Sequence, residues 1–258
     1  MKLEIKGIKF SYGSTPVLNN ISFRLEGGEV LTIVGPNGSG KSTLLKCIDR
    51  VLKPQCGCIM IDGKDIKGIG SEEVAKRMGY VPQSNGKSFP STVFDTILMG
   101  RKPYIRWAPV AKDLKVVSDV IGTLGLEGLA LRDINELSGG QRQKVIIGRA
   151  LAQEPKILLL DEPTANLDLK HQLEVLNLVK KQTRSGVSAI IAIHDLNLAL
   201  RYSDNVIMLN RGRVFAAGGL EVLNPENIEA VYGIKVRVIN HSKGIFVIPE
   251  ESIGDKNG

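Results

Sequence analysis

Hydrophobic and polar residues alternate in short stretches at the start of the chain. Lys2 to Lys6 and Ile21 to Leu25 follow this pattern, which is typical of strands in a half-buried antiparallel sheet. Val30 to Val34 is instead a compact apolar run that ends directly in glycine-rich sequence, and such a run indicates a buried strand. The pattern predicts an N-terminal β-subdomain that leads into a second, buried sheet.

The next segments predict a helix, two strands and a second, shorter helix. Apolar residues recur at helical spacing from Lys41 onward, and Pro54 ends that helix. Ile59 to Ile61 and Gly79 to Val81 have the apolar character of strands. Ser71 to Met78, which lies between them, is expected to be a short helix.

Residues 85–136 are expected to form a helical insertion between two halves that contain strands. The segment Ser84 to Pro90 is polar and loop-like. A helix is predicted at Val93 to Arg101, and a second helix carries apolar residues at helical spacing until Gly125 ends it.

Alternation of helices and strands resumes after the insertion. A helix is expected from Ser138 to the residue before Pro155, and Ile157 to Leu160 is an apolar strand. Another helix, which Gly186 ends, leads into the buried strand Val187 to Ile193. Parallel strands connected by helices form a doubly wound α/β fold, whose chemistry lies at the carboxyl ends of the strands.

The C-terminal part of the chain predicts two hairpins and a helix. They are expected at Val206 to Asn210 with Arg213 to Ala216, at Pro225 to Tyr232, and at Val236 to Ile239 with Ile245 to Ile248. We therefore expect a single domain over residues 1–240 and a tail hairpin in residues 241–258.

Composition excludes several classes of protein. Hydrophobic residues make up 43% of the 258 residues and charged residues 24%, which is the balance of a soluble globular chain. The net charge of +7 comes from scattered Lys and Arg residues without a basic arm, so we expect no nucleic-acid partner. No apolar stretch approaches the ~20 residues of a membrane span, so the chain is not expected to be a channel or permease.

The clearest motif matches the phosphate-binding pattern G-x-x-x-x-G-K-[ST]. Its glycines let successive backbone N–H groups point at phosphate oxygens, and the following helix points its positive N-terminus at the same anion. Lys41 is expected to reach the β- and γ-phosphates of ATP and to assist hydrolysis, and the Ser42 hydroxyl is expected to bind Mg²⁺. The predicted ATP-binding residues of this loop are Gly35, Pro36, Asn37, Gly38, Ser39, Gly40, Lys41, Ser42 and Thr43.

Two adjacent carboxylates follow the apolar strand Ile157 to Leu160. Asp161 is expected to hold Mg²⁺, directly or through water, and Glu162 is expected to be the general base for the water that attacks the γ-phosphate. An Asp-Glu pair after a strand is often only a helix cap. Together with a P-loop, the pair becomes a specific indication of ATP hydrolysis.

A second glycine-rich segment, Leu137 to Gln141, follows the insertion. Ser138 stands where a helix is expected to begin, so its simplest role is that of an N-cap. Gly139 and Gly140 together with the helix N-terminus also make a second anion site. One domain rarely needs two phosphate cradles for one nucleotide.

The combination of the P-loop, Leu137 to Gln141 and the Asp161-Glu162 pair resembles the ATPase subunits of ABC transporters over nearly the whole chain. The resemblance implies a RecA-like P-loop NTPase core with a mostly parallel sheet, an N-terminal antiparallel β-subdomain and a helical insertion. It also implies a homodimer in which ATP and Mg²⁺ lie between one P-loop and Ser138 to Gln141 of the partner.

Four further residues match positions of that family. Tyr12 would stack on adenine, and Gln83 would contact Mg²⁺ or the attacking water. Asp168 would lie in a loop that communicates across the dimer, and His194 would contact the γ-phosphate and help to orient the water. Without the resemblance, Tyr12 would be a strand-edge aromatic, Gln83 a surface residue and His194 a structural residue.

Softer signals favour one branch of the family. Met99 to Tyr104, Leu167 to Gln172 and Pro225 to Val238 resemble segments of the importers of iron chelates, haem and vitamin B12. They imply an ATPase on the cytoplasmic face of the cell membrane, bound to permease subunits and served indirectly by an extracytoplasmic substrate-binding protein.

Two alternatives stay open at the level of the sequence. One is a soluble ABC-type ATPase of iron–sulfur cluster assembly, and the other is the ATPase subunit of an exporter. The transported molecule cannot be named from this chain, because in such an arrangement the substrate contacts the permease and the binding protein.

Overall fold

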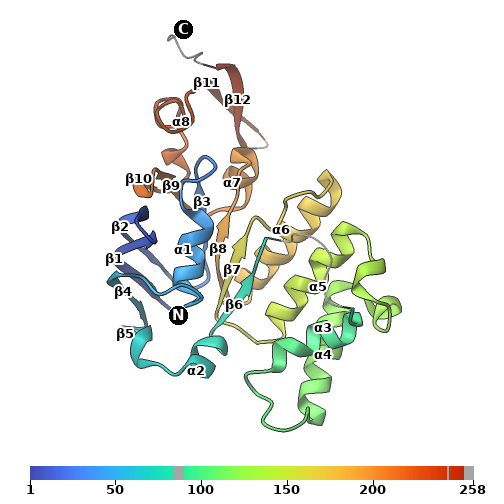
Figure 1. Ribbon diagram of the computed structural model, residues 1–258. Coiled ribbons are helices and arrows are strands. Elements are labelled where there is room, and N and C mark those ends of the chain that lie inside the picture. Colours follow the sequence, from blue (N-terminus) through green and yellow to red (C-terminus); the bar gives the residue numbers. More distant parts are fainter. Residues whose placement is uncertain (84–89, 243, 253–258) are drawn as a thin grey trace.

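The computed structural model describes residues 1–83, 90–242 and 244–252 (Figure 1). The strands are β1 (Leu3–Tyr12), β2 (Thr15–Leu25), β3 (Val30–Val34), β4 (Cys56–Ile61), β5 (Lys64–Asp65), β6 (Met78–Val81), β7 (Ile157–Asp161), β8 (Ser188–Ala192), β9 (Asn205–Asn210), β10 (Arg213–Gly218), β11 (Ile234–His241) and β12 (Gly244–Ser252). The α-helices are α1 (Lys41–Ile48), α2 (Ser71–Ala75), α3 (Val93–Leu98), α4 (Ala111–Leu124), α5 (Gly139–Leu151), α6 (Leu169–Arg184), α7 (Leu196–Tyr202) and α8 (Pro225–Tyr232). Short 3-10 helices are η1 (Ile66–Gly68), η2 (Met99–Arg101), η3 (Glu127–Leu129), η4 (Ile134–Glu136) and η5 (Leu220–Val222).

A six-stranded sheet with the strand order β10-β9-β3-β8-β7-β6 forms the centre of the molecule (Figure 1). The strands from β9 to β6 are parallel, and β10 is an antiparallel edge strand. Every residue of β3, β7 and β8 is buried, which explains their nearly continuous apolar sequence. Because parallel strands end at the same edge, the loops after β3, β6, β7 and β8 gather there.

Two hydrophobic cores cover the two faces of this sheet. Leu44 and Ile48 of α1 pack with Leu159 of β7 and with the N-terminal sheet in the first core. The second core contains Leu158 of β7 together with residues of α5, α6 and α7, including Ile147 of α5. Adjacent residues of a strand point to opposite faces, so α1 and α5 pack against opposite faces of the same sheet.

The N-terminal strands form a separate antiparallel sheet with the order β2-β1-β4-β5, as expected. Ile5 and Ile8 of β1 and Ile59 of β4 are buried, whereas Lys6 and Lys9 of β1 are exposed. The buried residues belong to the same core as α1, so this sheet packs against the helix that follows the P-loop.

The helical insertion is also confirmed. Val93 and Ile97 of α3, Val117 and Ile121 of α4, and Val145 of α5 share a third hydrophobic core. The expected polar loop after Gln83 falls largely on residues 84–89, which lie outside the described part of the chain.

Two predicted boundaries differ from the structure. The helix expected to reach Met78 ends at Ala75, because Met78 already pairs with Ile157 in the parallel sheet. The tail hairpin is formed by β11 and β12 and begins at Ile234, directly after Gly233 ends α8 with a left-handed φ of 69°. The hairpin therefore lies on both sides of residue 240, and the division into a domain of residues 1–240 and a tail stays a prediction.

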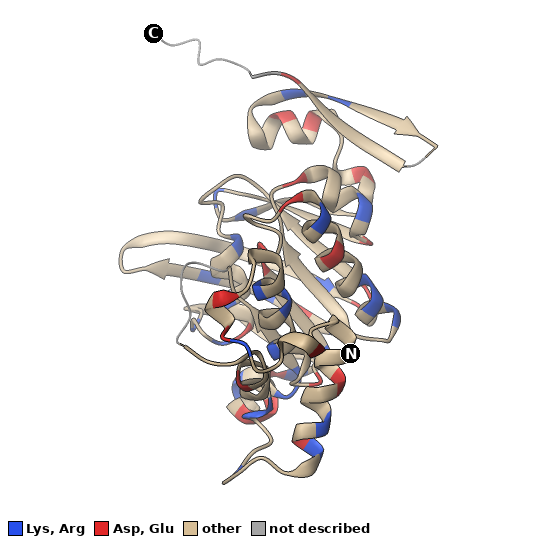
Figure 2. Ribbon diagram, turned by 90° about the vertical axis from the view of Figure 1, so that its right-hand side faces the viewer, with Lys and Arg blue, Asp and Glu red and all other residues tan. Residues whose placement is uncertain are grey.

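Charged residues of both signs are interspersed over the helices that Figure 2 shows, as the scattered Lys and Arg residues of the sequence predict. Among the residues that the structure describes, no helix combines the length and the apolar character needed to cross a membrane.

Asp49 follows α1 at its C-cap, where a carboxylate meets the negative end of the helix dipole. Burial raises the pKa of its carboxyl from 3.8 to about 7. The unfolded chain releases this proton at the ordinary, lower pKa, so folding stability declines as the pH rises from about 4 to about 7 and stays reduced above that. Asp49→Asn keeps the side chain neutral and is expected to raise the free energy of unfolding by roughly 2 kcal/mol near pH 8, and by much less near pH 4.

Urea denaturation of both proteins at the two pH values measures this effect. Asp119→Asn removes a carboxylate at an exposed position of α4 and is the control. An Asp49→Asn variant no more stable than the wild type near pH 8 would show that the Asp49 carboxylate is well hydrated in the folded protein.

Candidate functional site

The loop between β3 and α1 has a backbone that only glycine can adopt at two positions. Gly35 has a φ of 151°, and a Cβ there would lie 2.2 Å from the carbonyl oxygen of Leu209. Gly40, at the N-cap of α1, has a φ of 104°, and a Cβ there would lie 2.8 Å from Leu18 Cδ2. The loop therefore lies close against β9 and β2, and it leads directly into the N-terminus of α1.

Lys41 is the first residue of α1 and is only 5% exposed. Its Nζ donates hydrogen bonds to the carbonyl oxygens of Gly35 at 2.8 Å and of Pro36 at 3.1 Å. Burial lowers the pKa of the Lys41 ammonium, and the nearby carboxylates of Glu162 and Asp161 oppose that shift. The ammonium is thus held in the hollow of the loop, close to both carboxylates.

Ser39 supplies an independent indication of a ligand in the loop. The residue is 2% exposed, and its Oγ has no hydrogen-bond partner among the residues that the structure describes. A buried hydroxyl without a partner is costly, and a phosphate oxygen is a suitable acceptor for it. The loop therefore fits the phosphate groups of a nucleotide.

Ser42 and Asp161 meet beside the P-loop. Ser42 Oγ donates a hydrogen bond of 2.8 Å to Asp161 Oδ1, which lies at the end of β7. Tyr80 of β6 donates to the other carboxylate oxygen, Oδ2, at 3.3 Å. Burial raises the pKa of the Asp161 carboxyl, and the two hydrogen bonds partly offset this effect. Hydroxyl and carboxylate oxygens at one point are the ligand types that Mg²⁺ prefers.

Glu162 contacts two other predicted site residues, Gln83 and His194, and these three residues are here called the carboxylate site. Gln83, which follows β6, donates from Nε2 to Glu162 Oε2 at 2.6 Å. His194, which follows β8, places its Nε2 2.5 Å from Glu162 Oε1. The Glu162 backbone has a left-handed φ of 49°, and its N–H donates to the carbonyl oxygen of Ala192. Three residues predicted from separate segments thus meet at the edge where β6, β7 and β8 end.

Tyr12 lies at the end of β1, where it pairs with Thr15 of β2. Its ring is 50% exposed and contacts Phe10 edge-on, with 4.9 Å between the ring centroids. The following residues of β2, Val17 and Leu18, are those that approach Gly40. The hairpin thus presents an exposed aromatic ring near the P-loop.

The second glycine-rich segment has a structural role within the chain. Ser138 is the N-cap of α5: its Oγ accepts from the Gln141 N–H at 3.3 Å, and Gln141 Oε1 accepts from the Ser138 N–H at 3.1 Å. A Cβ at Gly140 would lie 2.2 Å from the ring of His171, whereas the nearest atom to one at Gly139 would be 3.8 Å away. The N-cap role of Ser138 is confirmed, and Gly139 is exposed.

Asp168 is the N-cap of α6 and is tied to the same region. Its Oδ1 accepts from the His171 N–H at 2.9 Å and lies 2.7 Å from His171 Nδ1. Because the His171 ring packs over Gly140, Asp168 and the start of α5 are linked through one imidazole. The structure does not join this group to the P-loop: α1 and α5 pack on opposite faces of the sheet.

Tyr80 is the functional candidate that the sequence did not reveal. It is a partly buried residue of a short strand, and only the pairing of β6 with β7 brings its hydroxyl to Asp161. In the sequence, Tyr80 is an ordinary aromatic residue of a short strand that ends just before Pro82, and this pattern gave no distinctive signal.

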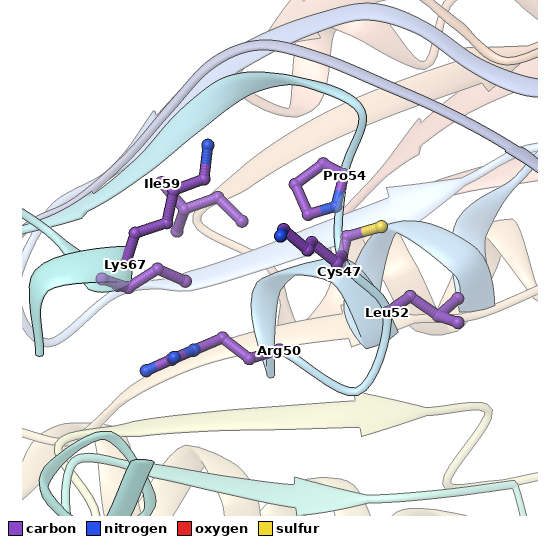
Figure 3. Close-up of a pocket in the computed structure, with 8 residues that line it drawn as sticks. Cys47, Arg50, Leu52, Pro54, Ile59 and Lys67 are labelled. Atoms are coloured by element: carbon purple, nitrogen blue, oxygen red, sulfur yellow. The ribbon is translucent and has the colours of Figure 1, made fainter. Parts of the chain in front are cut away.

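A cavity of about 380 Å³ lies at the other end of α1 and is separate from this site (Figure 3). Its lining combines apolar residues with three cations: Cys47, Leu52, Pro54, Ile59 and Ile66, with Arg50, Lys53 and Lys67. Burial raises the pKa of the Cys47 thiol to about 11, so this thiol stays protonated at neutral pH. None of these residues belongs to the P-loop or to the carboxylate site.

Comparison with known protein families matches residues 18–165 to the ABC transporter family. An uncharacterized ABC transporter ATP-binding protein of Methanocaldococcus jannaschii is 53% identical over 96% of this chain and 97% of its own length. The petrobactin import ATP-binding protein of Bacillus anthracis is 37% identical over 99% of this chain and 95% of its own length.

Solved structures show the same relationship. A chain of a transporter assigned to the metal-chelate type of ABC transporter, in an inward-facing conformation, superposes with a TM-score of 0.84 at 30% identity and covers 96% of this chain and 97% of its own. A dimeric ATP-binding cassette bound to ADP and phosphate after hydrolysis has a TM-score of 0.74 at 30% identity, over 84% of this chain and 98% of its own. The chain therefore belongs to the ABC transporter family, as one of its ATP-hydrolysing cassettes.

Proposed function

We propose that this chain powers an importer that takes up a metal chelate, such as an iron siderophore, haem or cobalamin, through a membrane permease. Two copies would bind the permease subunits as a homodimer on the cytoplasmic face of the membrane, and an extracytoplasmic binding protein would deliver the cargo. The similarity to a petrobactin import protein and to a metal-chelate type transporter supports this class of cargo. The observation that carries the proposed chemistry is the contact of Glu162 with both Gln83 and His194 beside the P-loop.

The P-loop is the proposed phosphate site. Its backbone N–H groups and Lys41 would bind the β- and γ-phosphates of ATP and neutralise charge as the γ-phosphoryl group transfers. Ser42 and Asp161 would hold Mg²⁺, which when bound neutralises the phosphate oxygens further. The raised pKa of Asp161 fits this role, because a cation there favours the charged carboxylate. Tyr12 would stack its exposed ring on the adenine.

Glu162 is the proposed general base. Its carboxylate would accept the proton of a water molecule as that water attacks the γ-phosphate. Gln83 holds one oxygen of the Glu162 carboxylate and His194 holds the other, which orients the carboxylate. In this arrangement His194 would also contact the γ-phosphate, and Gln83 would contact Mg²⁺ or the attacking water.

The N-terminus of α5 is the proposed second half of the site, supplied to the partner chain. Ser138 and Gln141 pair their own N–H groups in the capping box, and the N–H groups of Gly139 and Gly140 between them belong to the first turn of the helix, where an anion binds well. These residues and the P-loop lie on opposite faces of the sheet in one chain, so a head-to-tail dimer is needed to place both on one nucleotide. Asp168 would carry the state of one nucleotide to α5 through His171.

Gly139→Ala tests this use of α5. The substituted chain has room for the methyl group, because the nearest atom would be 3.8 Å away, so thermal stability and ATP binding by the isolated chain should not change. In the assembled transporter the methyl group would stand between the helix N-terminus and the partner's phosphates, and we expect ATP turnover to fall at least about tenfold. Steady-state ATPase assays on the assembled complex measure this.

Gly128→Ala in η3 is the matched control, since a Cβ there would meet no atom within 4 Å and Gly128 lies away from both proposed half-sites. Full turnover in the Gly139→Ala complex would contradict the proposed contact between α5 and the partner's nucleotide.

Reconstitution tests the function as a whole. The chain, its permease and a binding protein loaded with a candidate chelate are assembled in proteoliposomes, and ATP hydrolysis and chelate uptake are followed together. If the chain serves an importer, the loaded binding protein should stimulate ATP hydrolysis and the chelate should accumulate inside the proteoliposomes. Co-purification with a soluble scaffold would instead favour iron–sulfur cluster assembly, and ATP-driven movement outward would favour export.

A further inference from the structure

The segment from Lys102 to Lys112, here called the Trp107 loop, projects from the helical region and runs from the end of η2 into the first turn of α4 (Figure 1). Trp107 at its centre is 98% exposed, and Val110 is 60% exposed. Every residue from Arg106 to Lys112 is exposed. A fully exposed tryptophan on a protein surface exposes a large apolar area to water, and such a residue commonly marks an interaction site.

The base of the loop is rigid. Arg101, which precedes it, is 1% exposed and bridges Asp113 at 3.0 Å and Glu154 at 2.7 Å. The Arg101 guanidinium also lies 3.9 Å from the centre of the Tyr104 ring, whose hydroxyl donates to the Gln153 carbonyl oxygen at 2.8 Å. Arg101 and Asp113 thus clamp the two ends of the loop together, so Trp107 is held away from the protein rather than folded onto it.

The charge of the loop has one sign. The sequence KPYIRWAPVAK contains Lys102, Arg106 and Lys112 and no acidic residue. None of these three cations makes an ion pair within 4 Å among the residues that the structure describes. Arg106 acts on Glu72 only at longer range, and Glu72 is already paired with Lys76 at 2.9 Å. An exposed tryptophan between unpaired cations is the composition of segments that lie in the interface of an anionic membrane.

We propose that the Trp107 loop binds the anionic phospholipid surface of the membrane directly, with the Trp107 ring in the headgroup layer and the three cations on lipid phosphates. This proposal rests on the proposed function only in that it needs a bilayer beside the cassette. Charge complementarity favours lipid as the occupant, since each Lys or Arg near an anionic surface contributes about 1 kcal/mol, or about fivefold in binding.

Trp107 is the single tryptophan of the chain, so its fluorescence reports on this loop alone. The full chain, without nucleotide or permease, is mixed with vesicles of phosphatidylglycerol and phosphatidylcholine. We expect the emission to shift to shorter wavelength and brominated lipids to quench it, with neither effect on vesicles of phosphatidylcholine alone. Raising the salt concentration to about 1 M should reverse the binding, because it screens exposed charges.

Vesicle sedimentation then assigns the binding to the loop. Lys102→Gln with Arg106→Gln should weaken binding about 25-fold, and Trp107→Ser should reduce the bound fraction severalfold. Lys170→Gln with Lys181→Gln removes the same charge from α6, and Leu131→Ser removes another apolar side chain that is 84% exposed; both should bind like the wild type. An equal loss in the α6 pair would show that net charge alone attracts the chain and would overturn the proposal.

Two further results would overturn it. Sedimentation with lipid but without a change in Trp107 emission would place the contact on another surface. A shift that appears only in neutral proteoliposomes containing the permease would identify protein, not lipid, as the partner of the loop. Because these measurements use no ATP, their failure leaves the ATPase assignment intact.

Discussion

Glu162→Gln is expected to lower ATP turnover by roughly 10²–10⁴-fold while ATP binding is kept, because a side-chain amide cannot accept the proton of the attacking water. The substitution preserves the size of the side chain and can still bond to Gln83 or His194, so the surrounding geometry should hold. ATP hydrolysis by the chain assembled with its permease measures turnover, and equilibrium titration with a fluorescent ATP analogue measures binding.

Glu127→Gln in η3 is the matched control, since it neutralises an exposed glutamate far from the carboxylate site. It should hydrolyse ATP like the wild type. If Glu162→Gln also hydrolysed ATP at the wild-type rate in the assembled complex, Glu162 would not be the base, and His194 would be the next residue to test.

The buried strands and the succession of strands and helices along the chain could be predicted, because burial acts on every residue of a central strand. Ile157 to Leu160 is apolar at each position since both faces of β7 are covered by hydrophobic cores. The P-loop was evident for a similar reason. Gly35 and Gly40 have backbone conformations and neighbours that exclude other residues, so the geometry of the loop requires glycine at both positions. The fold class and the family were accordingly correct.

The contacts between side chains could not be predicted in the same way. Gln83 and Glu162 are 79 residues apart and Ser42 and Asp161 are 119 apart, so their pairing depends on strand order and not on local pattern. Tyr80 was missed for this reason. The early end of α2 has a related cause, since pairing of Met78 with Ile157 takes precedence over the helical preference of the preceding residues.

Lys41→Ala is expected to weaken ATP binding roughly 100-fold and to abolish measurable turnover. Two losses act together: the phosphates lose a buried cation, worth about 1.5–3 kcal/mol per charged hydrogen bond, and the carbonyl oxygens of Gly35 and Pro36 lose their donor. Calorimetric titration of the isolated chain with Mg²⁺ and ATP measures the binding. Lys115→Ala, at an exposed position of α4, controls for the loss of one positive charge and should bind ATP normally.

Lys41→Arg distinguishes charge from shape. A guanidinium is wider and planar, and the hollow that holds the Lys41 ammonium leaves that side chain only 5% exposed, so the arginine should also bind ATP poorly. Together with Glu162→Gln this series separates the two steps: loss of Lys41 weakens ATP binding, whereas loss of Glu162 slows only hydrolysis. Wild-type affinity in Lys41→Ala would mean that the β- and γ-phosphates lie outside the P-loop, and the placement of Glu162 beside the reacting phosphate would then lose its support.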